Sequence, residues 1–134
     1  MITEKILWAL PAALVALCDF GVTLASQAEI YWRDRSAFVE SNPLFAYLLS
    51  IHPGWFLTGA LVWILEIISI SLLLPRLLSL ICSSSFVAGH SFGILTWLLY
   101  KHGVNFQIVY IYFPIVACLI IWQAKIYFSP QHHV

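Results

Sequence analysis

Four long apolar runs constrain this chain more than any other feature of its sequence. They cover residues 6–28, 54–74, 77–100 and 104–127. A hydrocarbon core of about 30 Å is crossed by about 20 residues of α-helix, so each run is long enough to span a bilayer. Only helices and closed barrels satisfy their backbone hydrogen bonds in lipid, and the uninterrupted runs lack the alternating pattern of barrel strands. The sequence therefore predicts an all-α integral membrane protein, in which residues 1–134 form a single antiparallel four-helix transmembrane bundle.

The composition supports a membrane location and argues against a nucleic-acid partner. Hydrophobic residues make up 62% of the chain and charged residues 9%, whereas charged residues are about a quarter of a soluble domain. Six Lys and Arg balance six Asp and Glu, and no basic run is present that would follow a phosphate backbone. The lipid bilayer is therefore the expected partner, and no nucleic acid is expected.

The first run is expected to be kept as a spanning helix. It begins after Lys5, as a signal peptide would, but it lacks a small-residue cleavage site and contains Asp19. Four spans place both ends of the chain on one side of the membrane. The positive-inside rule does not orient the bundle, because Lys and Arg are equally numerous on the two sides. One side has Lys5, Arg76 and Lys125, and the other has Arg33, Arg35 and Lys101.

Between the first two spans, the sequence predicts a short helix over residues 43–51. Asn42 is a typical N-cap, and Pro43 fits the first helical position, where its missing N–H costs nothing. About nine residues are too few to cross the bilayer, yet the segment is too apolar to lie in water. We therefore expect this helix to be interfacial or re-entrant.

Three ionisable side chains, Asp19, Glu66 and His90, lie near the middle of three predicted spans. Counted from the membrane face that carries the first long connection, they lie about 10, 12 and 11 residues deep, or roughly 15–18 Å at about 1.5 Å per residue. An ionised side chain at this depth costs about 2.5–3.5 kcal/mol on insertion scales. Side chains placed independently would scatter in depth, so the agreement predicts that the three converge on one site.

The donor atoms of this predicted cluster are of the kinds that zinc accepts. Carboxylate oxygens of Asp19 and Glu66 and an imidazole nitrogen of His90 would leave a fourth position for water, whose pKa the metal would lower. The short helix would bring Glu40 and Asn42 toward the site, as general base and orienting hydrogen-bond donor. The leading hypothesis is therefore a metal-dependent membrane hydrolase that holds a divalent ion such as Zn²⁺ and acts on a lipid or a membrane-bound peptide.

Part of this set also resembles a known sequence pattern. Asp19-x-x-x-Thr23, followed by Glu40-Ser-Asn42-Pro43-Leu, is similar to the D-x-x-x-T … E-x-N-P-L pattern of a family of small bacterial and archaeal four-span proteins of unknown function (DUF5658-like). The resemblance implies that these five residues belong together, and that the chain lies in a prokaryotic inner (plasma) membrane. It implies no particular activity.

Other interpretations of the same residues stay open. A protonated Asp19 can bond a neighbouring helix, Glu66 or His90 can satisfy a hydrogen bond between spans, and Asn42 can be no more than a helix cap. A second function is a proton- or ion-coupled carrier with the three midspan residues as a relay, and so small a chain would then act as a homo-oligomer. A third is a non-catalytic partner subunit of a membrane complex, whose acids would meet basic residues of another protein.

Overall fold

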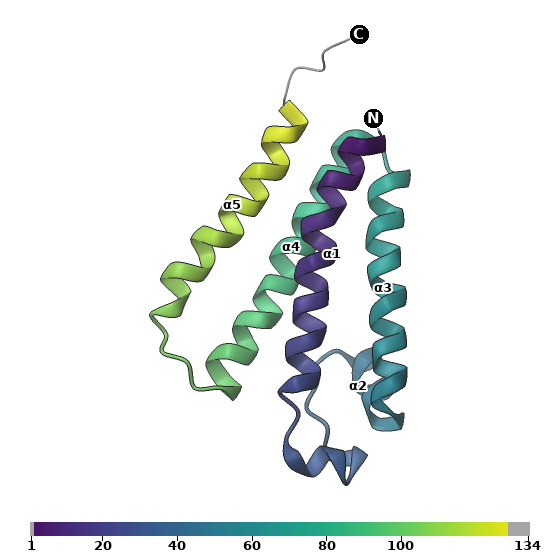
Figure 1. Cartoon of the computed structure of the whole chain (residues 1–134), viewed down its shortest axis with the longest axis vertical. Helices are drawn as coiled ribbons and strands as arrows, with labels where there is room; N and C mark the ends of the chain where they lie inside the picture. The colour runs from purple at the N-terminus through teal and green to yellow at the C-terminus, as the bar shows by residue number, and fades with distance from the viewer. Residues whose placement is uncertain (1, 129–134) are drawn as a thin grey trace.

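The four predicted spans are all helical in the computed structural model, which describes residues 2–128. The long helices are α1 (Ile2–Ala25), α3 (Pro53–Leu73), α4 (Arg76–Thr96) and α5 (Ile108–Phe128). Each is long and apolar enough to cross a membrane, α4 together with the turn that extends it to Lys101. Residues 2–128 contain no strand. The predicted all-α membrane bundle is therefore confirmed (Figure 1).

The first helix ends earlier than predicted, at Ala25, because the side chain of Gln27 binds the following connection instead. Gln27 Nε2 donates to the carbonyl oxygens of Thr23 (3.0 Å) and Val39 (2.9 Å). Val39 N donates in turn to Gln27 Oε1 at 2.9 Å. One buried amide thus joins the end of α1 to the far end of the connection.

The link between α4 and α5 is longer than predicted. A π-helical turn, η3 (Trp97–Lys101), continues α4, and Gly103 follows with a φ of 60°, the left-handed conformation expected just past a helix end. Asn105 Oδ1 accepts the N–H of Gln107 at 3.0 Å and turns the chain. As a result α5 begins only at Ile108.

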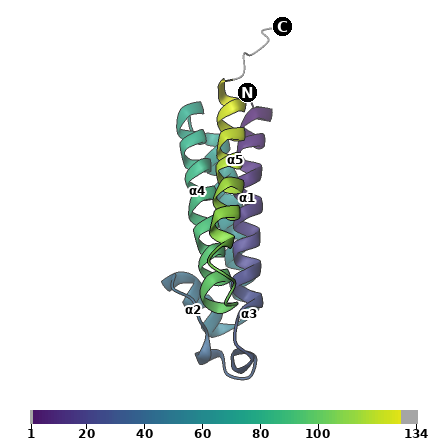
Figure 2. The same ribbon diagram turned by 90° about the vertical axis from the view of Figure 1, so that its left-hand side faces the viewer.

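Helix α1 lies at the centre of the bundle. It packs against both α3 and α4, while α5 lies beyond α4 at the edge (Figure 1); seen from that edge, α5 crosses in front of α4 and α1 (Figure 2). Ala12 and Ala16 of α1 are fully buried, and such small side chains allow helices to approach closely in lipid. Phe20 continues this face, with its ring centroid 4.7 Å from that of Phe45 and 5.8 Å from that of Phe56.

The connection after α1 contains two short 3₁₀ turns, η1 (Glu29–Trp32) and η2 (Arg35–Ala37), and ends at the cap of α2. Asn42 Oδ1 accepts the N–H of Leu44 at 3.0 Å, and Pro43 occupies the first helical position. Both features match the prediction. We call this end of the bundle the loop end.

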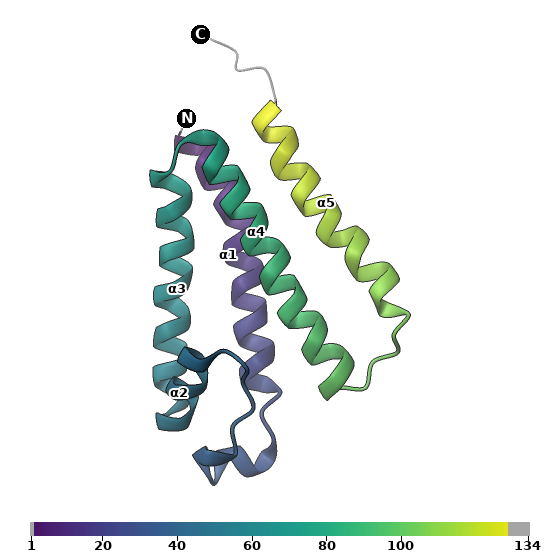
Figure 3. The ribbon, with the colours of Figure 1, turned by 180° about the vertical axis from the view of Figure 1, so that it is seen from behind.

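Helix α2 (Pro43–Ile51) lies beside α3 and not across the end of the bundle. Figure 3 shows the connection rising from the loop end before α2 returns along α3. Gly59 permits this packing, because a Cβ there would lie 2.5 Å from Leu48 Cδ1. Tyr31, fully buried, donates its hydroxyl to the carbonyl oxygen of Leu49 at 3.1 Å. The structure thus packs α2 along α3, and the choice between an interfacial and a re-entrant helix stays a prediction.

Helix α5 is fastened to the bundle near its C-terminal end by polar contacts. Gln123 is fully buried; its Nε2 donates to the carbonyl oxygen of Trp8 at 2.7 Å, and its Oε1 accepts from Ser84 Oγ at 3.1 Å. Arg76 Nη2 donates to the carbonyl oxygen of Tyr127 at 2.7 Å. Because most of α5 is otherwise exposed, these bonds decide where it docks.

We expect Gln123→Leu to loosen α5. The change removes two hydrogen bonds between helices, each worth about 0.6–1.7 kcal/mol in membrane proteins, and leaves the Trp8 carbonyl without that donor. Thermal unfolding in detergent should show a lower midpoint than for the wild type. Ser85→Ala is the control, because the Ser85 hydroxyl bonds only the Ile81 carbonyl of its own helix; equal midpoints for the two variants would contradict the role given to Gln123.

Candidate functional site

Asp19 of α1 and His90 of α4 form a hydrogen-bonded pair inside the bundle. Asp19 Oδ2 lies 2.8 Å from His90 Nδ1, and the two side chains are 16% and 14% exposed. On the other edge of the ring, Trp63 Nε1 of α3 donates to His90 Nε2 at 3.1 Å. Three helices therefore meet through one chain of hydrogen bonds, which contains two of the three predicted midspan residues.

The Trp63 contact fixes the protonation of His90. An indole N–H only donates, so His90 Nε2 accepts and carries no proton. The ring is then neutral, with its proton on Nδ1, and it donates that proton to an Asp19 carboxylate. Among residues 2–128, no Lys or Arg lies within ion-pair distance of Asp19. When Asp19 is ionised, the pair therefore carries one negative charge, and the only side chain that bonds it is an uncharged donor.

Gly93 makes room for the Asp19 carboxylate. A Cβ added at Gly93 would lie 2.5 Å from Asp19 Oδ1 and 2.8 Å from Oδ2. Gly89, one turn earlier on the same helix, has nothing within 4 Å of such a Cβ. Of these two glycines, only Gly93 is needed for the close approach of α1 and α4 at the acid.

Asp19 lines a cavity of about 550 Å³ at the loop end of the bundle. Its volume is within the range of small-molecule sites. Thr23 lines it together with Asp19 from α1, and Glu40 and Asn42 line it from the connection. The structure thus places four residues of the D-x-x-x-T … E-x-N-P-L pattern around one cavity.

The opposite wall of the cavity is formed by α4 and its π-helical turn. Three aromatic residues contribute to it, Phe92, Trp97 and Tyr100, and the chain then reaches Lys101. Short π-helical segments inside α-helices are frequent at functional sites, because the wider turn displaces side chains from their helical positions. Here the wider turn carries three of the lining residues.

Glu40 lies in the connection, outside the four spanning helices, and is half-buried. Burial raises the pKa of its carboxyl above the usual value, and the nearby negative charge of Asp19 adds to the rise; hydrogen bonds from the N–H groups of Asn42 and Ser41 act in the opposite direction without cancelling it. The bond from Asn42 N to Glu40 Oε1 is 2.7 Å long. A proton is therefore held more tightly on Glu40 than on an exposed glutamate.

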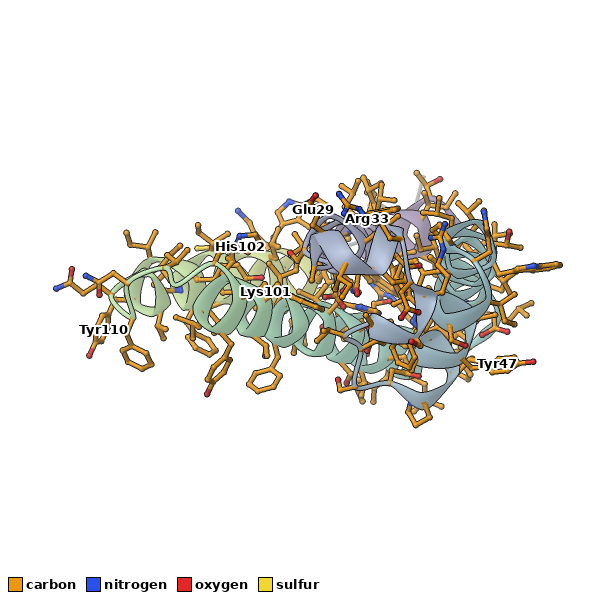
Figure 4. The ribbon with its side chains drawn as sticks, turned by 90° about the horizontal axis from the view of Figure 1, so that it is seen from below. Glu29, Arg33, Tyr47, Lys101, His102 and Tyr110 are labelled. Atoms are coloured by element: carbon orange, nitrogen blue, oxygen red, sulfur yellow. The ribbon has the colours of Figure 1, made fainter. Side chains whose placement is uncertain are left out.

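A hydrogen bond joins the chain just after α1 to the chain just after the π-helical turn. Ser26, at the end of α1, lies with its Oγ 2.7 Å from His102 Nε2, just past the π-helical turn. Seen from the loop end, Lys101 and His102 lie beside the connection that carries Glu29 and Arg33 (Figure 4). The position of the cavity wall at Lys101 is thus linked to α1.

Glu66 does not join the Asp19–His90 pair. Its side chain is exposed on α3, while Trp63, three residues earlier on the same helix, points to His90. Both ring nitrogens of His90 are engaged in hydrogen bonds. Among the side chains that the structure describes, no group of three or more His, Cys, Asp or Glu is placed to hold a metal ion. The predicted zinc donor set is therefore not assembled, and a metal at this site stays a prediction.

The sequence pattern predicts no site role for Trp63 or Lys101, and it marks Gly93 only as one of several small residues that allow close contact between helices. Trp63 lies three residues before Glu66 on the same helix. Its indole, and not the Glu66 carboxylate, contacts His90. Gly93 lies three residues after His90, in a stretch of small residues. Spacing alone marks such positions only as close-packing candidates.

Comparison with models of protein families, with curated proteins and with solved structures found no match to this chain. The resemblance to the DUF5658-like pattern therefore stays a prediction, and the site must be interpreted from its own geometry.

We expect Gly93→Ala to separate Asp19 from His90. The added methyl group overlaps the carboxylate, and disturbing a hydrogen bond to a charged group costs about 1–3 kcal/mol. Thermal unfolding in detergent should show a lower midpoint, and the nitrogen NMR signals of His90 should lose the single Nδ1–H form. Gly89→Ala is the matched control, since its Cβ meets nothing and alanine favours a helix by up to about 1 kcal/mol. If both variants melt alike, the contact at Gly93 is not tight.

Glu40→Gln should make stability less dependent on pH. Because the folded-state pKa of Glu40 is raised above the usual 4.5, its contribution to stability is fully present below that pH and is lost as the pH rises through the folded-state value. The variant should therefore melt at a higher temperature than the wild type near pH 8, and the difference should shrink toward about pH 4. Glu29→Gln, an exposed change in the same connection, should show no such trend; a pH-independent difference for Glu40→Gln would oppose this assignment.

Proposed function

We propose that this membrane protein is a proton-coupled carrier that binds a small organic cation at Asp19. One observation carries the proposal: the Asp19 carboxylate, bonded to the neutral donor His90, lies on the wall of a cavity of about 550 Å³. A proton- or ion-coupled carrier is the second function that the sequence suggests. In this proposal Glu40 replaces Glu66 as the second acid.

The charge of the site favours a positive occupant. A carboxylate in a low-dielectric interior is costly unless it is paired, and no Lys or Arg of residues 2–128 forms an ion pair with Asp19. Either a proton or a cation removes that cost. Since both would occupy the same carboxylate, binding of the cation releases the proton, and this competition couples their movements.

The walls of the cavity suit an organic cation. Aromatic faces attract ammonium groups within about 6 Å of the ring centre, and Phe92, Trp97 and Tyr100 line the cavity together with Asp19. Lys101 also lines it, but that side chain is exposed, as are those of Phe92 and Tyr100, so water and salt screen its charge more than they screen the mostly buried Asp19.

The short helix α2 is a further feature that this protein has in common with carriers. Many transporters bind their substrate near the bilayer midplane, where short or interrupted helices end. Here α2 begins at Asn42, which lines the cavity, and Glu40 lies beside it with a pKa that favours holding a proton. Glu40 is therefore suited to pass protons between Asp19 and the water at the loop end.

The test uses proteoliposomes that enclose a pH-sensitive dye. Adding a series of quaternary alkylammonium ions outside, from tetramethylammonium to tetrapropylammonium, should raise the internal pH as each cation enters in exchange for a proton. Asp19→Asn should reduce this rate to that of liposomes without protein, because the amide cannot ionise. Asp34→Asn is the control, as Asp34 bonds only the nearby Ser36 on the exposed connection.

The proposal fails if Asp19→Asn transports as the wild type does, or if no cation of the series changes the internal pH. The same preparation addresses the metal-dependent hydrolase, the leading hypothesis from the sequence. Its support is that Glu40 and Asn42, the predicted base and orienting donor, line the cavity with Asp19. Stoichiometric zinc, iron or manganese in the purified protein, removed together with activity by a chelator, would favour the hydrolase instead.

A further inference from the structure

Glu66 is the midspan acid that the candidate site does not use. Its side chain is exposed on α3, on a different face from Trp63 and Ile67, which turn toward the bundle. Glu66 lies seven residues before Leu73, the last residue of α3, and is therefore about 10 Å along the helix from that end. A carboxyl at this depth is well inside a hydrocarbon core of about 30 Å.

The surroundings of Glu66 form an outward face of α3 without a neighbour in the bundle. Val62 and Leu65 are 50% and 62% exposed, and Ser69 is exposed as well. Helix α3 lies at the opposite edge of the bundle from α5 (Figures 1 and 3). If lipid covered this face, the carboxyl would have no hydrogen-bond partner, a costly state for any polar group in hydrocarbon.

We propose that this face of α3 binds the same face of a second copy of the chain, with the two Glu66 carboxyls bonded to each other around a two-fold axis. This inference does not depend on the carrier proposal. A protonated carboxyl is both donor and acceptor, so two copies satisfy one another, and symmetric pairs are the commonest way in which identical chains associate.

The chain's own charges are compatible with a contact between two Glu66 carboxyls. The Lys and Arg residues of the described chain all lie in connections or near helix ends, and none lies at the level of Glu66; they are Lys5, Arg33, Arg35, Arg76, Lys101 and Lys125. In a parallel dimer, the polar groups that reach Glu66 are therefore Glu66 and Ser69 of the second copy.

The first experiment measures the mass of the full-length protein in detergent and in lipid nanodiscs across a range of protein-to-lipid ratios. The wild type should be a dimer of the 15.2 kDa chain. Glu66→Leu removes both hydrogen bonds and should weaken dimerisation about tenfold or more. Glu66→Gln keeps a donor and an acceptor and should retain most of the dimer. Because Glu66 is exposed in the monomer, neither change disturbs the folded chain.

The second experiment locates the contact by disulfide formation in a variant without its three native cysteines, Cys18, Cys82 and Cys118. Ser69→Cys, one turn from Glu66, should form a disulfide between copies under mild oxidation. Ala117→Cys is the matched control, an exposed position in the middle of α5, and should not.

A monomeric wild type, an unchanged dimer for Glu66→Leu, or equal cross-linking at the two cysteine positions would each overturn the proposal. A wild type that is monomeric alone and binds a different membrane protein through Glu66 would also overturn it, in favour of the partner-subunit hypothesis. None of these measurements depends on transport, so failure of the carrier proposal would leave this inference standing, and the reverse also holds.

Discussion

The structure depends on a hydrogen-bonded chain that crosses the middle of the bundle, from Trp63 through His90 to Asp19. Each bond satisfies a polar atom that lipid would leave without a partner. Since the three residues come from α3, α4 and α1, the same bonds that satisfy the acid also fix how these helices are rotated relative to one another. Gly93 supports this arrangement by letting the carboxylate lie against the backbone of α4.

The polar face of α1 continues from this chain to the loop end. Thr23, Ser26 and Gln27 follow Asp19 at helical spacing, and all three are buried. Gln27 holds the connection at Val39, directly before Glu40. A second acid, Glu40, therefore reaches the cavity because Gln27, two residues after the end of α1, binds the backbone next to it. Asn42 caps the start of α2 at the same place.

The ionisable residues in the middle of the spans point in two different directions. Asp19 and His90 face inward and satisfy each other, whereas Glu66 faces away from the bundle with exposed apolar neighbours. An inward acid needs a proton or a ligand that enters the bundle, and an outward acid needs a partner outside it. This division separates the proposed transport site from the proposed dimer face, although both rest on the cost of an unpaired carboxyl in hydrocarbon.

The sequence by itself determined the spanning helices, the Asn42 cap, the short helix after it and the depths of the ionisable residues, because length, hydropathy and capping are properties of local sequence. The matching depths of Asp19, Glu66 and His90 did not determine which way each side chain points around its helix axis. Whether Glu66 or Trp63 meets His90 depends on the rotation of α3 about its own axis, which packing against α1, α2 and α4 sets together. Only the tertiary structure could therefore decide that Glu40 replaces Glu66 in the site of Asp19, since Trp63 and Glu66 lie only about 60° apart around the axis of α3 and a small rotation of the helix decides which of them faces His90.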